Sequence, residues 1–281
     1  MPTLTLREAF TRCYEIRWSG SKGEQTAVCN SETAMEALGD EFPITKITGK
    51  VLQDYVVVLK EKGLSPATIN RKVAAIMTIL KVAEMGGYIT STPSIPREKE
   101  AEHRTRVLTQ EEEETLLSLL TPSPDTDYSR LVVFLIDTGM RVGEALTLPW
   151  GDVKVAMGSG TPSVTVTKSK GGRPRTIPLT RRAMVALAEM GDEPGGPWMA
   201  LSQSAFGHTW SKVRNRMGLS EDKEFVPHAL RHTCASRLVR AGVPIQVVKE
   251  WLGHSTLAMT LRYAHLDTKQ MEDARDLLEV R

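Results

Sequence analysis

The chain has few cysteines, and their spacing excludes two kinds of small stabilised domain. Its 281 residues include only three, Cys13, Cys29 and Cys234, with no CxxC pair. A disulfide framework needs regularly spaced cysteines, and a zinc knuckle needs paired ones. We therefore expect three reduced thiols.

Long apolar runs are also missing. The longest, LVVFLIDTG at 131–139, contains an aspartate and is far shorter than the roughly 20 residues that a membrane-spanning helix needs. Near the N-terminus, charged side chains interrupt the stretch where a signal peptide would be apolar, namely Arg7, Glu8, Arg12 and Glu15. We expect no membrane span and a cytoplasmic protein.

A large net charge is absent too, since the formal value is only +2. The distribution of charge, more than its total, decides whether a protein can hold nucleic acid. The segment KSKGGRPRTIPLTRR at 168–182 has six basic residues and no acidic one, and Lys212, Arg214 and Arg216 form a second basic group. A solvated surface is the commoner explanation for one such cluster, so the clusters alone do not establish DNA binding.

The length and the order of elements predict two domains. The pattern over 4–88 predicts helices, the last of which begins at Ser65 and Pro66 and ends at two glycines. Residues 92–106 combine prolines and many charges with no apolar period, as an exposed linker does. We therefore expect a helical domain at 1–91, a linker at 92–106 and a second domain at 107–281.

The second domain should be mainly α-helical with a small antiparallel sheet, which makes the whole chain an α+β protein. Thr109 is placed to cap a helix that has acids in its first turn. SVTVTK and RTIPL are typical of short strands, and SKGGRP between them suits a hairpin turn. Helical patterns resume from residue 180.

Four short segments carry the candidate functional residues: TGMRVGEAL, TKSKGGRPRTIPL, PHALRHTCASRLVRAG and LGHSTLAMTLRYAH. Taken singly, each has an ordinary structural explanation, such as a surface arginine paired with an acid. His228 and His232 have the spacing of HExxH zinc ligands, but Ala229 stands where the catalytic glutamate would be. We therefore predict no metal site.

In this order, the four segments resemble those of the tyrosine recombinases, also called the phage integrase family. The resemblance covers about residues 104–266 directly, and the N-terminal helices resemble the family's SAM-like core-binding domain more loosely. The catalytic set that it implies is Arg141, Lys170, His228, Arg231, His254 and Tyr263, with Glu144 and His232 in support. The DNA contacts that we expect are Lys168, Arg173, Arg175, Lys212, Arg214 and Arg216.

These residue types suit attack on a phosphodiester. A tyrosine hydroxyl, with a reference pKa of about 10, is a poor nucleophile at neutral pH, and a phosphodiester repels an oxyanion. Two arginine forks can hold the phosphate oxygens, and a hairpin lysine can protonate the departing 5′ oxygen. Spacing does not decide between Lys170 and Lys168, which would share one face of a strand. By the resemblance, His228 would accept or relay the tyrosine proton and His254 would bind a phosphate oxygen.

The resemblance implies that Tyr263 cleaves DNA through a 3′-phosphotyrosyl bond and that a second 5′ hydroxyl reverses the step. We expect neither metal nor ATP, and no other cofactor, because a GxxxxGK[ST] loop and an acidic metal cluster are both missing. The expected partners are double-stranded DNA gripped by a C-shaped clamp, further copies of the chain in a tetrameric synapse, and an accessory DNA-bending protein.

Two other functions stay open. A type IB topoisomerase uses similar residues but exchanges no strands between duplexes, and a DNA-binding regulator has no catalysis. The complete catalytic set argues against a regulator, which needs no tyrosine at position 263. For the tail DTKQMEDARDLLEVR, packing on its own domain and docking on the next protomer are equally weighted.

Overall fold

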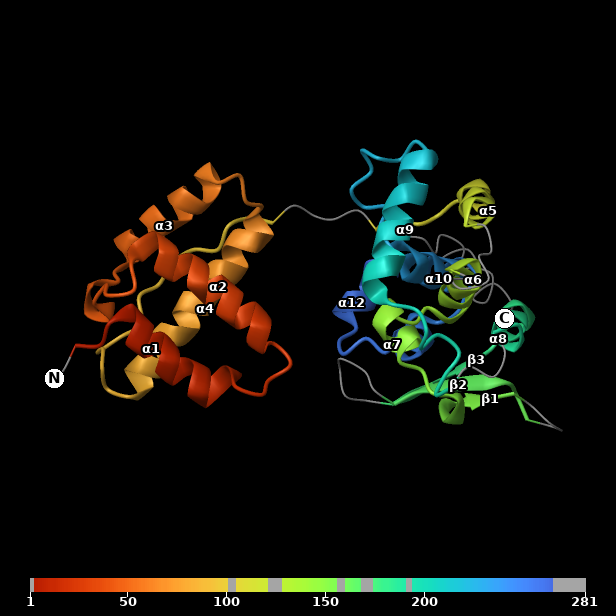
Figure 1. Cartoon of the computed structure of the whole chain (residues 1–281), viewed down its shortest axis with the longest axis horizontal. Coiled ribbons are helices and arrows are strands. Elements are labelled where there is room, and N and C mark those ends of the chain that lie inside the picture. The colour runs from red at the N-terminus through yellow and green to blue at the C-terminus, as the bar shows by residue number, and fades with distance from the viewer. Residues whose placement is uncertain are drawn as a thin grey trace, which may run out of the picture. The chain divides into compact units, whose positions relative to one another are not determined.

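The structure is a computed structural model of the chain that describes residues 3–100, 105–120, 128–155, 160–167, 174–190 and 194–264. The chain divides into two compact units, Met1–His103 and Arg104–Arg281 (Figure 1). The expected fold class, mainly helical with a small antiparallel sheet, is confirmed. Among the described residues, no helix is long and apolar enough to cross a membrane.

The first unit is a helical bundle built around its last helix. That helix begins as the sequence predicts, with the Ser65 hydroxyl accepting from the Thr68 amide and Pro66 in the first turn. It buries an apolar stripe and packs against the other three α-helices. The elements are α1 (Leu6–Cys13), a π-helical turn (Tyr14–Trp18), α2 (Glu24–Leu38), a 3₁₀ turn (Ile44–Lys46), α3 (Gly49–Glu61) and α4 (Pro66–Met85).

Part of the predicted linker lies on the first unit. The Glu98 backbone exchanges two hydrogen bonds with the side chain of Asn70, each 2.9 Å long, and Ile95 packs against the apolar core. The Thr92 amide donates to the Glu84 carboxylate at 3.1 Å. The sequence shows no apolar period here because this segment is held largely by hydrogen bonds to side chains of α4.

The second unit is mainly helical and contains a small sheet. Its strands pair in the order β1-β2-β3, all antiparallel, with Val164 opposite Ile177, and the sheet lies at one edge of the unit (Figure 1). The elements are α5 (Gln110–Leu119), α6 (Tyr128–Thr138), α7 (Val142–Leu146), a 3₁₀ turn (Trp150–Asp152), β1 (Val153–Lys154), β2 (Ser163–Val166), β3 (Arg175–Pro178), α8 (Arg181–Ala188), α9 (Gln203–Arg216), α10 (His228–Arg240), α11 (Ile245–Leu252) and α12 (Ala258–Leu261).

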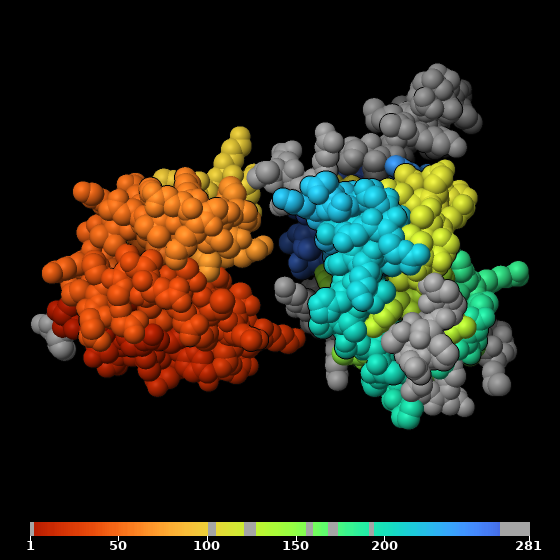
Figure 2. Space-filling model, turned by 45° about the horizontal axis from the view of Figure 1, so that its top comes forward, coloured from red at the N-terminus to blue at the C-terminus, as the bar shows by residue number. Residues whose placement is uncertain are grey.

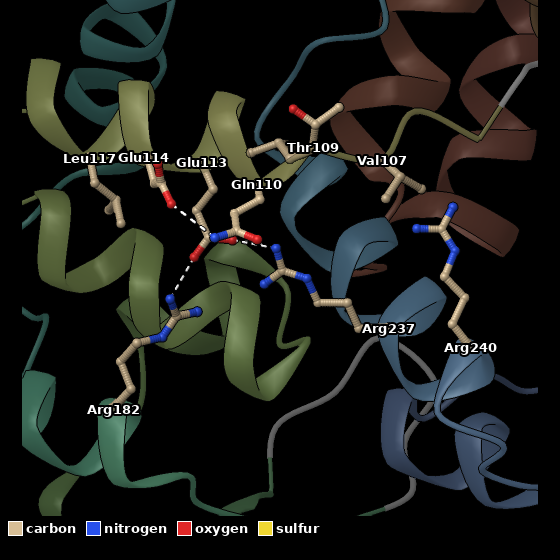
Figure 3. A pocket seen from close by; sticks show the side chains of 10 residues that line it. Val107, Thr109, Gln110, Glu113, Glu114, Leu117, Arg182, Arg237 and Arg240 are labelled. Carbon is tan, nitrogen blue, oxygen red and sulfur yellow. Dashed lines mark hydrogen bonds and ion pairs between the residues drawn. The ribbon is translucent and has the colours of Figure 1, made fainter.

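The core of the second unit holds α6 and α10 together. Most of α6 is buried, and it packs against α8 and α10. A buried carboxylate, Glu113 of α5, pairs with Arg182 of α8 at 2.6 Å and with Arg237 of α10 at 2.5 Å (Figure 3). Arg182 also pairs with Asp137 of α6. This network ties α5, α6, α8 and α10 together, and the first turns of α10 supply residues of the candidate site.

Candidate active site

The first turns of α10 supply three candidate residues. His228, Arg231 and His232 stand at i, i+3 and i+4, so they share one helix face. The rings of the two histidines meet edge to face with their centroids 4.8 Å apart. His228 is exposed at the start of the helix, and His232 is half-buried behind it.

Arg231 is buried, with 2% of its surface exposed. Its guanidinium donates to the carbonyl of Gly139 at 2.7 Å and to that of Leu252. Gly139 has a φ of +64°, and an added Cβ would come within 2.8 Å of the Leu252 side chain, so glycine suits this turn. Burial, helped by the charge of Arg141, lowers the pKa of Arg231 to about 9. The two carbonyls orient this cation without neutralising it.

Glu144 is the acid that organises the arginines. It accepts hydrogen bonds from the Arg141 amide at 3.0 Å, the Arg141 guanidinium at 2.7 Å and the Arg175 guanidinium at 2.6 Å. Burial alone would raise the pKa of Glu144, but the bonds from both arginines outweigh it and hold the pKa below its usual value. Glu144 is therefore ionised at neutral pH and holds Arg141 at the start of α7.

Arg175 lies inside the second unit, at the start of β3. Only 7% of its side chain is exposed, and its Nε donates to the carbonyl of Trp251 at 3.0 Å. Gly253, with φ +66°, leaves room for it, since an added Cβ would lie 2.9 Å from Arg175 Cδ. We expected Arg175 to contact DNA. In the structure its guanidinium is hydrogen-bonded to Glu144 and to the carbonyl of Trp251 at the end of α11, which leaves little of it facing solvent.

His254 follows the left-handed glycine that ends α11. The side chain is 9% exposed, and its Nδ1 lies 2.9 Å from the hydroxyl of the fully buried Thr260. Burial, reinforced by Arg231 and other nearby cations, lowers the pKa of His254 to about 3. The ring is therefore neutral at pH 7, with its orientation fixed by Thr260.

Tyr263 is buried, at 1% exposure, against a small apolar cluster of α10 and α11. Its hydroxyl oxygen lies 2.5 Å from Nδ1 of His232. Burial raises the pKa of Tyr263 to about 12, against the opposing effect of Arg262, and burial lowers that of His232 to about 4. Both side chains are therefore neutral at pH 7. We expected His228 to accept or relay the tyrosine proton, and the histidine in contact with the hydroxyl is His232.

These side chains meet at one pocket of about 410 Å³. Its lining includes five of the six expected catalytic residues, while Lys170 lies outside the described residues, as do Lys168 and Arg173. The lining is Arg141, His228, Arg231, His232, Gly253, His254, Ser255, Met259, Arg262 and Tyr263.

The sequence profile described as the phage integrase family matches residues 106–270, more than half of the chain and all of this pocket. The chain belongs to the phage integrase family. Curated relatives agree with this. The integrase of Escherichia phage P2 is 27% identical over 239 residues, which span 84% of this chain and 66% of the relative. Tyrosine recombinase XerC of Xanthomonas campestris pv. campestris is 27% identical over 83% of this chain and 74% of the relative.

Solved structures of this integrase family have the same fold. A lambda integrase dimer bound to a COC' core site aligns with a TM-score of 0.76 at 20% identity, covering 93% of this chain and 95% of that one. The XerH site-specific recombinase bound to a palindromic difH substrate aligns with a TM-score of 0.70 at 21% identity, covering 98% and 85%. At such identities the likeness concerns the fold.

Sequence reasoning missed two residues of this integrase-family pocket. Arg262, the residue before Tyr263, lines the pocket. Thr260 holds the ring of His254 in place through a hydrogen bond to its Nδ1. A basic residue next to the candidate nucleophile was a signal that could have identified Arg262. No local signal marks Thr260, because its role depends on the turn after α11. Within the described residues, no three His, Cys, Asp or Glu side chains are placed to hold a metal ion.

The second basic group lies on α9, which runs along the surface of the second unit (Figure 2). Lys212 and Arg216 are exposed, and Arg214 is half-buried. The end of α9 therefore presents cations to solvent, as a contact to DNA phosphates requires.

Proposed function

We propose that this chain is a site-specific DNA recombinase that cleaves and rejoins DNA strands through a 3′-phosphotyrosyl bond at Tyr263, without metal or ATP. The observation that carries the proposal is the convergence of Tyr263 with three arginines and three histidines on one pocket. The relatives are an integrase and a tyrosine recombinase, which supports the same activity.

The phosphate would be held by Arg141 and Arg231. Arg231 is preorganised by backbone carbonyls and Arg141 by Glu144, so neither side chain needs to be ordered when DNA arrives. Their forks can stabilise the charge of the pentacoordinate transition state. His254 is neutral and its Nδ1 faces Thr260, so its Nε2 would be the nitrogen that binds a phosphate oxygen.

The remaining steps use the other expected residues. The phenolic oxygen of Tyr263 attacks phosphorus and its proton passes to a neighbouring histidine. The bond from phosphorus to the 5′ oxygen breaks, and Lys170 supplies a proton to that oxygen, with Lys168 as its alternative. A 5′ hydroxyl of another strand then attacks the phosphotyrosine and restores the tyrosine. The energy of the broken bond is kept in the intermediate.

For the whole assembly, we propose a tetrameric synapse on two DNA sites, in which the first unit serves as the core-binding domain. The basic end of α9 would contact the DNA backbone of the same site. A DNA-bending protein is the accessory partner that such a synapse could use.

A nicked DNA substrate whose cleaved end is lost by diffusion should trap the protein as a covalent adduct. We expect Tyr263→Phe to abolish the adduct and to leave DNA binding intact, because only the hydroxyl is removed. Tyr88→Phe, in the first unit, is the matched control and should form the adduct normally. Adduct formation by Tyr263→Phe would disprove the assignment.

The same preparation separates recombination from relaxation. A recombinase should yield recombinant products from two DNA sites. Relaxation of supercoiled DNA without any recombinant product would instead identify a DNA-relaxing enzyme of the type IB class.

A further inference from the structure

The hydroxyl of Tyr263 contacts a histidine that is not among the residues proposed to bind the phosphate. His232 sits one turn deeper than His228 on α10, and its Nδ1 faces the phenolic oxygen at 2.5 Å. Tyr263 also packs against apolar side chains of α10 and α11. His232 is therefore a proton acceptor already at the side of the candidate nucleophile.

The protonation states of the two side chains show which one donates the hydrogen bond. Both groups are neutral at pH 7, since the pKa of Tyr263 is raised to about 12 and that of His232 is lowered to about 4. A neutral phenol has one proton to donate and a neutral imidazole has one free nitrogen to accept it. With Nδ1 accepting from the tyrosine, the imidazole proton of His232 is on Nε2.

We propose that His232 is the general base that takes the proton of Tyr263 as the phenolic oxygen attacks phosphorus. This inference rests on the proposed recombinase function. In the forward step, the oxygen–phosphorus bond forms, the phenol proton moves to Nδ1, and the departing 5′ oxygen takes its proton from the general acid. In the rejoining step, the deprotonated general acid takes the proton of the attacking 5′ hydroxyl, the bond from phosphorus to the phenolic oxygen breaks, and the imidazolium returns its proton to the leaving tyrosine.

The charges around His232 explain why DNA would be needed to make it basic. It is faced by His228 and Arg231 on its own helix and by Arg262 beside Tyr263, and all three lower its pKa together with burial. Arg141 and His254 line the same pocket. A bound phosphodiester brings a negative charge among these cations, which favours the imidazolium. The base would thus gain strength when the substrate is in place.

The test compares two substitutions of His232 in single-turnover adduct formation on the nicked substrate between pH 6 and pH 8, below the pKa of Arg231. His232→Asn keeps an acceptor oxygen near the place of Nδ1 but cannot take up a proton, and His232→Ala removes the contact. His208→Asn, at an exposed position of α9, is the matched control and should keep the rate of the unsubstituted protein. DNA affinity and thermal melting are measured for each variant.

We expect both His232 variants to slow adduct formation by about 10²- to 10⁴-fold at pH 7 with little change in DNA affinity. In the variants, hydroxide must deprotonate the phenol, so the rate should rise about tenfold per pH unit. The unsubstituted protein should level off once His232 is neutral. If His232→Asn keeps a rate within about threefold and an unchanged pH profile, the side chain only positions Tyr263 and the inference is wrong.

A substrate with sulfur in place of the bridging 5′ oxygen gives a second readout. A thiolate leaves without needing a proton, so this substrate should relieve the defect of Lys170→Ala and leave that of His232→Asn. Relief of His232→Asn would place its action on the leaving group and overturn the inference. If the unsubstituted protein forms no adduct at all, the proposed function itself fails, which is a separate outcome.

Discussion

At the scale of single residues, the candidate site combines buried cations with neutral histidines. Arg231 keeps its charge while bound to two carbonyls, and His254 is held neutral by burial and its cationic neighbours. A phosphate entering this pocket would meet fixed donors and two full positive charges. Residues that touch no substrate should still matter, because they fix the donors.

Thr260 is such a residue. We expect Thr260→Val to slow adduct formation by about tenfold or more, because His254 loses the hydroxyl that orients its ring. Thr260→Ser keeps the hydroxyl and should restore most of the rate. Single-turnover cleavage of the nicked substrate measures both variants, and equal rates for valine and serine would argue that this hydrogen bond has no part in the reaction.

Glu144 should matter for stability as well as for activity. Glu144→Gln leaves Arg141 and Arg175 without their shared counter-charge, which should lower the free energy of unfolding by about 3 kcal/mol at pH 7. Because the folded-state pKa of Glu144 is depressed, its contribution is present above the unfolded value of about 4.3 and is lost as pH falls through the folded value.

Urea unfolding at pH 7 and at acid pH tests this. The difference between Glu144→Gln and the unsubstituted protein should shrink at acid pH. The exposed Glu114→Gln on α5 is the control and should change stability little. A difference that is constant with pH would mean that the carboxylate charge is not the cause.

At the scale of elements, the sequence predicted the helix starts and strands that depend on residues close together in the chain. The Ser65–Pro66 start of α4 and the Thr109 cap of α5 are as expected, as are the two strands around the hairpin. The burial of Arg175 and the partner of Tyr263 were not predictable, since these contacts join residues 76 and 31 positions apart. They depend on how β3, α10 and α11 pack, which no local pattern records.

Gly253, at the end of α11, lies against Arg175 of β3 and has a positive φ. Gly253→Ala should destabilise the protein by about 1–2 kcal/mol through its positive φ, with a further loss from contact with Arg175. It should also slow adduct formation, because His254 comes next in the chain. Gly207→Ala in α9, where an added Cβ meets open space, is the control and should be neutral or stabilising. Thermal melting that ranks the two variants in the opposite order would contradict this reading of the turn.

At the scale of the whole molecule, DNA binding has to come from a chain with a net charge of only +2. Two arginines of the basic stretch at 168–182 are committed to internal ion pairs, Arg175 with Glu144 and Arg182 with Glu113 and Asp137. Because their charges are paired, these two arginines add little to the positive electrostatic potential at the protein surface. The exposed cations at the end of α9 therefore contribute more of the attraction for DNA than the composition suggests.

Lys212→Ala should therefore weaken DNA binding about equally for all sequences. Each phosphate contact contributes about −0.9 to the slope of log affinity against log salt concentration, so the loss of one contact should flatten that slope by about one. Affinities measured at several salt concentrations give the slope directly. Lys223→Ala, at an exposed position after α9, is the matched control and should keep the slope of the unsubstituted protein. If Lys212→Ala weakens binding but leaves the slope unchanged, Lys212 acts through protein structure and does not neutralise a phosphate.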